Sequence, residues 1–114
     1  MAHVIDRETW AGDSDNWHGE LQGAPYGAGV SVIFFSRAEV GEGPRLHKHP
    51  YAETFIVRAG HGLYTIGDRK IEARAGQILV CPANTPHKFK NLGPGRLETI
   101  DIHASETFIT EWLE

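Results

Sequence analysis

The feature that most constrains the fold of this chain is the regular spacing of its short apolar runs. From residue 30 to residue 103, runs rich in β-branched and aromatic residues are interrupted by Gly, Pro, Asp or Asn at intervals of about eight to twelve positions. The runs cover residues 30–37, 53–58, 63–66, 70–73, 77–81, 87–91 and 96–103. Short strands at this spacing predict an all-β sandwich or barrel of antiparallel strands.

The size and charge of the chain restrict what such a barrel can do. Its 114 residues are enough for one domain and too few for two independent cores. The content of 40% apolar and 23% charged residues is ordinary for a globular protein. Eleven basic and fifteen acidic residues give a net charge of −4 with no basic run, so we expect no nucleic-acid partner.

The cysteine content and the N-terminus predict the compartment. Cys81 is the single cysteine and cannot form an internal disulfide, which favours a reducing compartment. The first eight residues carry charges where a signal peptide needs an apolar stretch, and no apolar run has the length of a membrane span. The sequence therefore predicts a cytoplasmic protein with no membrane partner.

Two segments flank the predicted barrel of residues 30–103. Residues 1–29 show neither a strand period nor a helix period, so we expect an irregular lead-in that packs on the barrel. Residues 104–114 have apolar positions that fit either a short helix or an edge strand, packed on the barrel end or on a second copy. Because a small barrel leaves sheet edges to cover, we expect this tail at the interface of a homodimer.

A cluster of histidines indicates a metal site. His47 and His49 share one face of an extended strand, Glu53 follows four residues later, and His87 opens a later run. Neutral imidazoles and a carboxylate suit divalent Fe, Mn, Ni, Co or Zn. The alternative for an isolated His-x-His pair is a solvated strand edge. His103 is placed outside the metal shell. Three other histidines have no ligand spacing and are expected to be exposed: His3, His18 and His61.

The residues around this cluster fit two longer motifs. Gly41, His47, His49, Glu53 and Gly60 have the spacing of the first cupin motif. The second motif is matched by Gly76, Pro82, His87 and Asn91, with Asn84 where a Gly is usual. The chain thus resembles a small single-domain cupin of the conserved barrel type. The resemblance implies a double-stranded β-helix, or jelly-roll barrel, in which His47, His49, Glu53 and His87 hold a divalent metal. Asn tolerates a left-handed turn, so we expect the turn at Asn84 to survive.

Residues that share a face with the ligands are candidates for a substrate pocket. Arg45 precedes His47 by two residues and could hold an anion, or it could pair with a surface acid. Phe55 and Phe89 follow Glu53 and His87 by two residues and could line the pocket or belong to the core. Tyr51 could donate a hydrogen bond near the metal, or it could lie in a loop or interface.

These features leave several classes of function open. The first is a metal-dependent enzyme, dioxygenase-like or isomerase-like, that acts on a small organic or anionic molecule. The second is a non-catalytic module that binds or senses a metal or a small molecule, since one fold can host both. The third is a barrel in which the metal has only a structural role.

Overall fold

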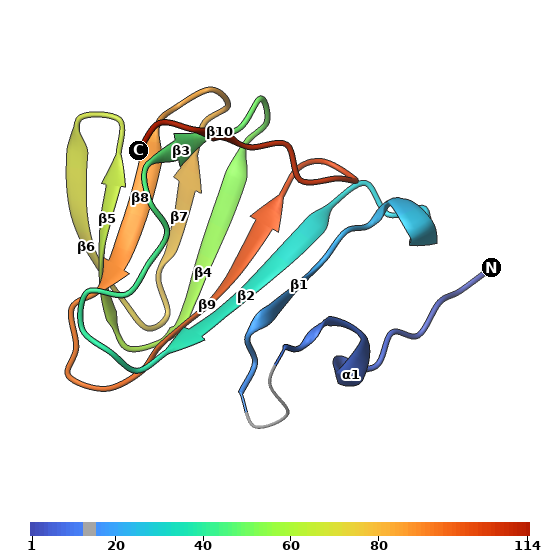
Figure 1. The fold of residues 1–114 in the computed structure, drawn as a ribbon, viewed down its shortest axis with the longest axis horizontal. Helices are drawn as coiled ribbons and strands as arrows, with labels where there is room; N and C mark the ends of the chain where they lie inside the picture. Colours follow the sequence, from blue (N-terminus) through green and yellow to red (C-terminus); the bar gives the residue numbers. More distant parts are fainter. Residues whose placement is uncertain (13–15) are drawn as a thin grey trace.

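The computed structural model describes residues 1–12 and 16–114 and contains two facing antiparallel β-sheets (Figure 1). Sheet A contains, in spatial order, β1 (Gly19–Leu21), β2 (Ser31–Arg37), β9 (Leu97–His103), β4 (Glu53–Ala59) and β7 (Ile78–Cys81). Sheet B contains β10 (Glu111–Trp112), β3 (His47–Lys48), β8 (His87–Asn91), β5 (His61–Ile66) and β6 (Arg69–Arg74). Two short helices, α1 (Arg7–Trp10) and η1 (Ala24–Tyr26), lie in the N-terminal segment. The all-β prediction is confirmed.

The strands lie where the apolar runs predict them. Each of the seven runs is matched by one strand, β2 or β4 to β9, with ends that differ by two residues or fewer. The N-terminal lead-in is less irregular than expected, because β1 pairs with the edge of β2 and extends sheet A. Residues 13–15 of the predicted lead-in lie outside the described residues.

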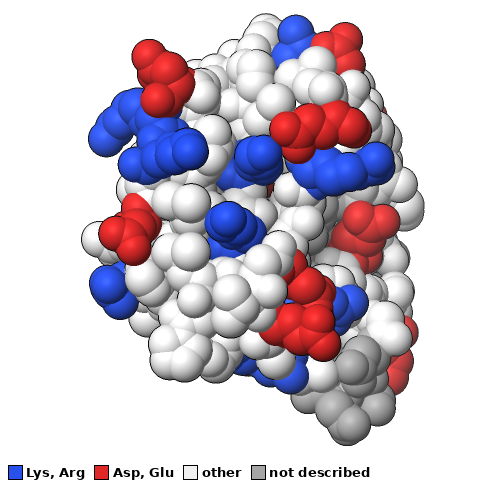
Figure 2. Space-filling view, turned by 60° about the vertical axis from the view of Figure 1, so that its left-hand side comes forward, with Lys and Arg blue, Asp and Glu red and all other residues white. Residues whose placement is uncertain are grey.

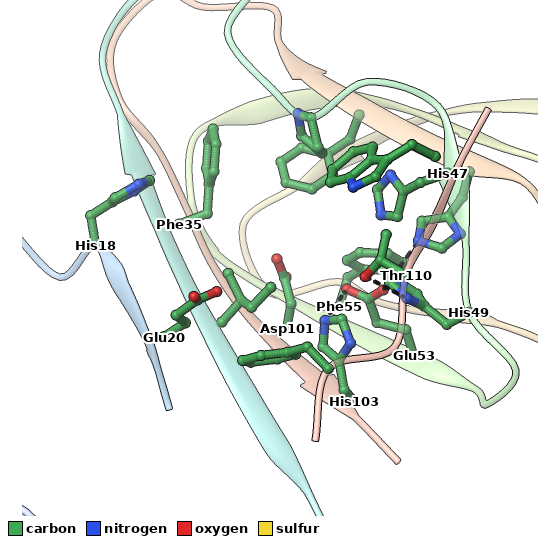
Figure 3. Close-up of a pocket in the computed structure, with 16 residues that line it drawn as sticks. His18, Glu20, Phe35, His47, His49, Glu53, Phe55, Asp101, His103 and Thr110 are labelled. Carbon is green, nitrogen blue, oxygen red and sulfur yellow. Dashed lines mark hydrogen bonds and ion pairs between the residues drawn. The ribbon is translucent and has the colours of Figure 1, made fainter. Parts of the chain in front are cut away.

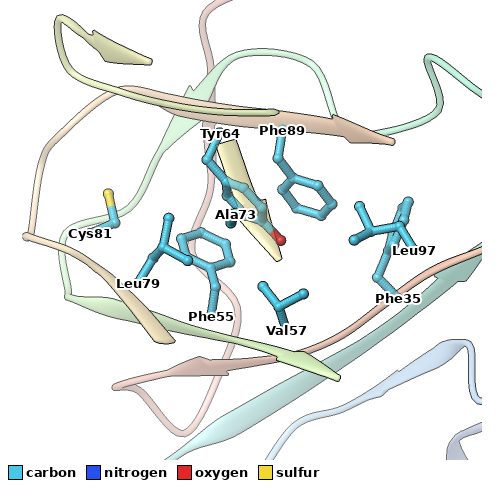
Figure 4. Packing of buried hydrophobic residues seen from close by; sticks show 9 residues of the cluster. All are labelled: Phe35, Phe55, Val57, Tyr64, Ala73, Leu79, Cys81, Phe89 and Leu97. Atoms are coloured by element: carbon cyan, nitrogen blue, oxygen red, sulfur yellow. The ribbon is translucent and has the colours of Figure 1, made fainter. Parts of the chain in front are cut away.

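The core lies between the two sheets and is built by alternation along the strands (Figure 4). In β4, Phe55 and Val57 point inward and are 1% exposed, and Thr54 and Ile56 point outward. Sheet B contributes the Phe89 ring, which stacks on Tyr64 at 4.9 Å between centroids. The same inward faces of β4 and β8 begin with Glu53 and His87, so the strands that build the core also carry the predicted ligands.

Two tight turns fix the ends of these strands. Gly60 has φ +91°, and a Cβ there would lie 2.4 Å from the carbonyl oxygen of Arg96, so only glycine fits. Asn84 has φ 61°, which confirms the turn expected from the sequence. The Asn84 N–H donates to the carbonyl of His49 at 2.7 Å and so connects this turn to the predicted ligands.

The C-terminal tail folds back over its own barrel (Figure 1). It forms β10, which pairs with β3 so that Trp112 lies opposite His47. Leu113 N–H donates to the Leu46 carbonyl at 2.9 Å, and the Lys48 ammonium lies 3.3 Å from Glu111. Of the two alternatives from the sequence, the strand is therefore correct and the helix is wrong.

The charged side chains are mixed on the face that Figure 2 shows, where Lys and Arg alternate with Asp and Glu. Among the ion pairs of the described residues, Lys88 and Glu114 have charged atoms 3.2 Å apart. Within the described ranges, no helix combines the length and apolar character that crossing a membrane requires.

Candidate metal centre

The four predicted ligands come together at one end of the barrel. His47 lies in β3 directly opposite His87 of β8, and His49 follows the end of β3. Glu53 is the first residue of β4 in the facing sheet. All four side chains are buried, and each offers a ligand atom within 4.8 Å of the others (Figure 3). These four residues, called the His/Glu group or the metal group below, can therefore hold a metal ion.

Backbone carbonyls set the tautomer of each of the three histidines. Nδ1 of His47 lies 2.6 Å from the Arg45 carbonyl oxygen, and Nδ1 of His49 lies 2.8 Å from that of Ile109. Nδ1 of His87 lies 2.9 Å from the carbonyl oxygen of Thr85. A carbonyl oxygen only accepts, so the proton of each neutral ring is on Nδ1 and the lone pair is on Nε2. Metal-binding histidines are oriented by this kind of hydrogen bond.

Glu53 faces two of these Nε2 atoms. Its Oε1 lies 3.1 Å from Nε2 of His49 and 3.1 Å from Nε2 of His87. Nε2 of His49 is buried and has no partner with hydrogen-bond geometry, which leaves its lone pair available to a cation. This unpaired nitrogen beside a carboxylate oxygen fits a divalent transition metal held by three imidazoles and one carboxylate.

The electrostatics of the site agree with this donor set. Desolvation of the Glu53 carboxyl raises its pKa, but the imidazoles of His103, His49 and His87 beside its oxygens outweigh this effect and lower the pKa below its usual range. Burial lowers the pKa of His47 to about 4, so this ring is neutral at pH 7. Burial also acts to lower the pKa of His87, but hydrogen bonds with Cys81 and Glu53 raise it to about 10. Metal binding at His87 would therefore release a proton.

A second pair of residues supports Glu53 from outside the four-residue group. Nε2 of His103 lies 3.2 Å from Oε2 of Glu53, and Nδ1 of His103 lies 2.6 Å from the Tyr51 hydroxyl. His103 is outside the group, as predicted, yet it contacts a ligand, which the sequence reasoning missed. No spacing in the sequence signals this contact, because His103 reaches Glu53 only through the β4–β9 register.

A cavity of about 350 Å³ opens beside the metal group, which is the size of a small-molecule site. Phe55 and Phe89 line it, as predicted for the pocket. Tyr51 does not line the cavity but contacts His103 behind it.

Arg45, predicted to face the cavity or its mouth, does not line the cavity. Its side chain is exposed, and its guanidinium lies 5.1 Å from the ring centroid of Trp112. The prediction assumed regular strand geometry back to Arg45, but β3 begins only at His47 after a bend at Leu46. Without regular pleating, residues two apart need not share a face.

The cavity also contains residues that the sequence reasoning missed. His18, expected to be exposed, is half-buried at the cavity and accepts a hydrogen bond from Ser36 N–H at 3.0 Å. The C-terminal tail, expected on the barrel end or on a second copy, covers the site with three side chains: Phe108, Thr110 and Trp112. The sequence reasoning also missed two acids that line the cavity, Glu20 and Asp101. No spacing in the sequence connects β1 or the tail to the ligands. They reach the cavity through the pairing of β1 with β2 and of β10 with β3.

The two antiparallel sheets and the buried His/Glu group place this chain in the class of double-stranded β-helix proteins with a candidate metal site. The chain belongs to the cupin family, since the family model for the cupin domain matches residues 34–103. SchB of Streptomyces halstedii is 38% identical over 72 residues, which cover 60% of this chain and 52% of that protein. The chain spans about half the length of the curated relatives it matches.

Two solved structures show the same fold. An uncharacterised conserved protein of Klebsiella pneumoniae with a double-stranded β-helix domain has a TM-score of 0.75 at 18% identity, over 100% of this chain and 99% of that one. Bacillus subtilis oxalate decarboxylase, a protein with Mn(II) centres, has a TM-score of 0.76 at 18% identity, over 83% of this chain and 27% of that one. At this sequence identity, the two likenesses establish the fold alone. Any inference about the reaction must come from the residues of the site.

Proposed function

We propose that this cupin barrel binds a divalent transition metal through His47, His49, Glu53 and His87. We further propose that it binds or converts a small organic molecule, including anionic ones, in the adjoining cavity, in a dioxygenase-like or isomerase-like reaction. The observation that carries the proposal is the shared orientation of the three imidazoles, each with Nδ1 on a backbone carbonyl. A bound metal would supply Lewis-acid chemistry and positions for ligands beyond the four protein donors. The Mn(II) centres of the oxalate decarboxylase fold neighbour support a metal in this kind of barrel.

The chain's own residues would prepare the site for such a ligand. Phe55, Phe89 and Trp112 give the cavity apolar walls that exclude water around the polar metal group. The Tyr51–His103 pair holds Oε2 of Glu53, which leaves Oε1 directed at the histidines. The aromatic side chains in the lining also suit a non-catalytic module that retains a small molecule, and this is the second candidate function.

Metal content tests the first part of the proposal. Untagged protein is reloaded with Mn(II), Fe(II), Co(II), Ni(II) or Zn(II), and bound metal is measured by elemental analysis. We expect about one equivalent in the wild type and in the control His3→Ala, whose side chain is exposed, because the site offers one set of ligands. His47→Ala and His87→Ala should keep the β-sheet circular dichroism and bind the metal at least about tenfold more weakly. A wild type that retains only a trace of every metal would contradict the proposal.

Turnover assays separate the two candidate functions. The metal-loaded protein is screened for oxygen consumption and for isomerisation of carbonyl and sugar substrates. Turnover that is lost in His47→Ala supports an enzyme. Ligand-induced rises in melting temperature without turnover of any substrate support a binding module.

The homodimer predicted from the sequence, with residues 104–114 at its interface, remains a proposal. The outer face of sheet A supports a second copy at a different interface. Ile78 and Val80 of β7 are 63% and 62% exposed, and Ile56 and Ile100 continue the apolar face through the strand register. A two-fold axis would place this face against the same face of a second copy. The cytoplasmic location predicted from the sequence also remains a prediction.

A further inference from the structure

Asp101 is a buried acid that the metal group does not use. It lies in β9, points inward, and is 2% exposed. Its carboxyl projects into the cavity between the His/Glu group and the side chains of His18 and Glu20 (Figure 3). Its Oδ1 is enclosed and has no hydrogen-bond partner within the part of the chain that the structure describes.

The cross-strand neighbours of Asp101 offer this carboxyl no polar partner. Its neighbours across the sheet are Phe55 on β4 and Ile33 on β2, both apolar. A buried carboxyl oxygen without a partner opposes folding, so such groups are rare unless a water or a ligand completes them. Burial, and then the charge of Glu53, raise the pKa of Asp101 well above its usual range, although the nearby Thr99 hydroxyl acts in the opposite direction.

The distance between Asp101 and the metal group suits a short ligand. Glu53 is paired with His103, and Asp101 precedes His103 by two residues on the same face of β9. Asp101 and Glu53 are therefore diagonal neighbours on one sheet face, a relation that separates residues by about 7–8 Å. A molecule of about three to five carbons is on the scale of this residue separation, and a cavity of about 350 Å³ can hold it.

We infer that Asp101 selects the ligand of this cavity by hydrogen-bonding a hydroxyl group on a small organic acid whose other end binds at the His/Glu metal group. A hydroxyl fits this position because it can both donate and accept, and so can pair with a carboxyl in either protonation state. The inference rests on the proposed function, since it takes a metal at the four ligands.

Two small acids provide the test. Lactate and glycerate share a carboxylate and a 2-hydroxyl that can chelate a metal, and glycerate alone has a hydroxyl on its third carbon. Protein loaded with Co(II) is titrated with each acid by calorimetry and by the visible spectrum of the cobalt. The variants are Asp101→Leu, Asp101→Asn and, as a matched control, Glu98→Gln, an acid on the outer side of the same strand.

We expect the wild type and Glu98→Gln to bind glycerate about tenfold more tightly than lactate, the effect of one hydrogen bond to a buried group. Asp101→Leu should reduce this ratio to about one by losing affinity for glycerate alone, with cobalt binding unchanged. Asp101→Asn retains a donor and an acceptor and should keep part of the preference.

Failure of the inference is distinguishable from failure of the proposed function. If the wild type binds one cobalt but binds both acids equally, or neither, Asp101 pairs only with water and the inference is overturned. The same holds if Asp101→Leu or Asp101→Asn keeps the full wild-type ratio. If the wild type binds no cobalt, the proposed metal site itself is wrong. The comparison of the two acids in the wild type needs no variant, so misfolding of Asp101→Leu does not remove the test.

Discussion

The hydroxyl of Tyr51 and Nδ1 of His103 are 2.6 Å apart, although 52 residues separate them in the chain. The Tyr51 oxygen also accepts the N–H of Ile109 at 3.4 Å, so its own proton is directed to His103. This leaves Nε2 of His103 as the N–H that faces Oε2 of Glu53 at 3.2 Å. A tyrosine outside the cavity thereby determines which oxygen of Glu53 faces the histidine ligands.

Removal of the Tyr51 hydroxyl should weaken metal binding. We expect Tyr51→Phe to lower the affinity for Co(II) about tenfold, the usual cost of losing a hydrogen bond that orients a ligand. The measurement is a titration with Co(II) in competition with a chelator. Tyr26→Phe, in η1 away from the site, serves as the control. Equal affinities in the two variants would contradict a positioning role for Tyr51.

The raised pKa of Asp101 predicts a specific dependence of stability on pH in the metal-free protein. Between the ordinary pKa of 3.8 and the raised value, the folded state keeps a proton that the unfolded state has lost. The contribution of Asp101 to the free energy of unfolding should therefore fall as the pH rises through this window, by up to about 1.4 kcal/mol per pH unit.

Asp101→Asn should lack this contribution, because an amide does not titrate. Urea denaturation at several pH values measures the difference in unfolding free energy between the variant and the wild type. That difference should shift in favour of the variant as the pH rises from 3.8. A difference that stays constant with pH would show that Asp101 is ionised in the folded protein as readily as in the unfolded chain.

Trp112 should report metal binding by fluorescence. Its ring lies 4.9 Å from that of His47, and Co(II) quenches a tryptophan at such short range. We expect cobalt to lower the emission of the wild type and of Trp17→Phe, since Trp17 packs on Phe34 on the outer face of sheet A. The drop should be much smaller in Trp112→Phe. A drop of the same size in Trp112→Phe would mean that the tail does not cover the site in solution.

The proposed homodimer is tested by sedimentation. At tens of micromolar, we expect the wild type to sediment as a dimer, because the apolar outer face of sheet A is then covered. Val80→Lys places a charge in that face and should shift the protein to a monomer. Val40→Lys changes a valine that is 70% exposed outside the strands and should have no effect. A monomeric wild type would contradict the dimer.

Strand periodicity explains which parts of the site could be predicted. His47 and His49 are two residues apart, and Phe55 and Phe89 follow a ligand at the same interval, so local geometry places them together. The prediction failed for Arg45 because a bend at Leu46 interrupts the strand. It succeeded at Asn84, because asparagine tolerates the left-handed backbone conformation that its φ of 61° shows.

The sequence by itself determined the barrel and its four candidate ligands, because both depend on short-range alternation and on turn residues at fixed intervals. Only the tertiary structure decided what surrounds those ligands. His18 reaches the cavity through the pairing of β1 with β2, and Trp112 reaches it through the pairing of β10 with β3. The contact of His103 with Glu53 and the unpaired carboxyl of Asp101 depend on the register between β9 and β4. Pairing between distant strands is a property of the folded chain, since it is fixed by packing of the whole core and not by any local spacing.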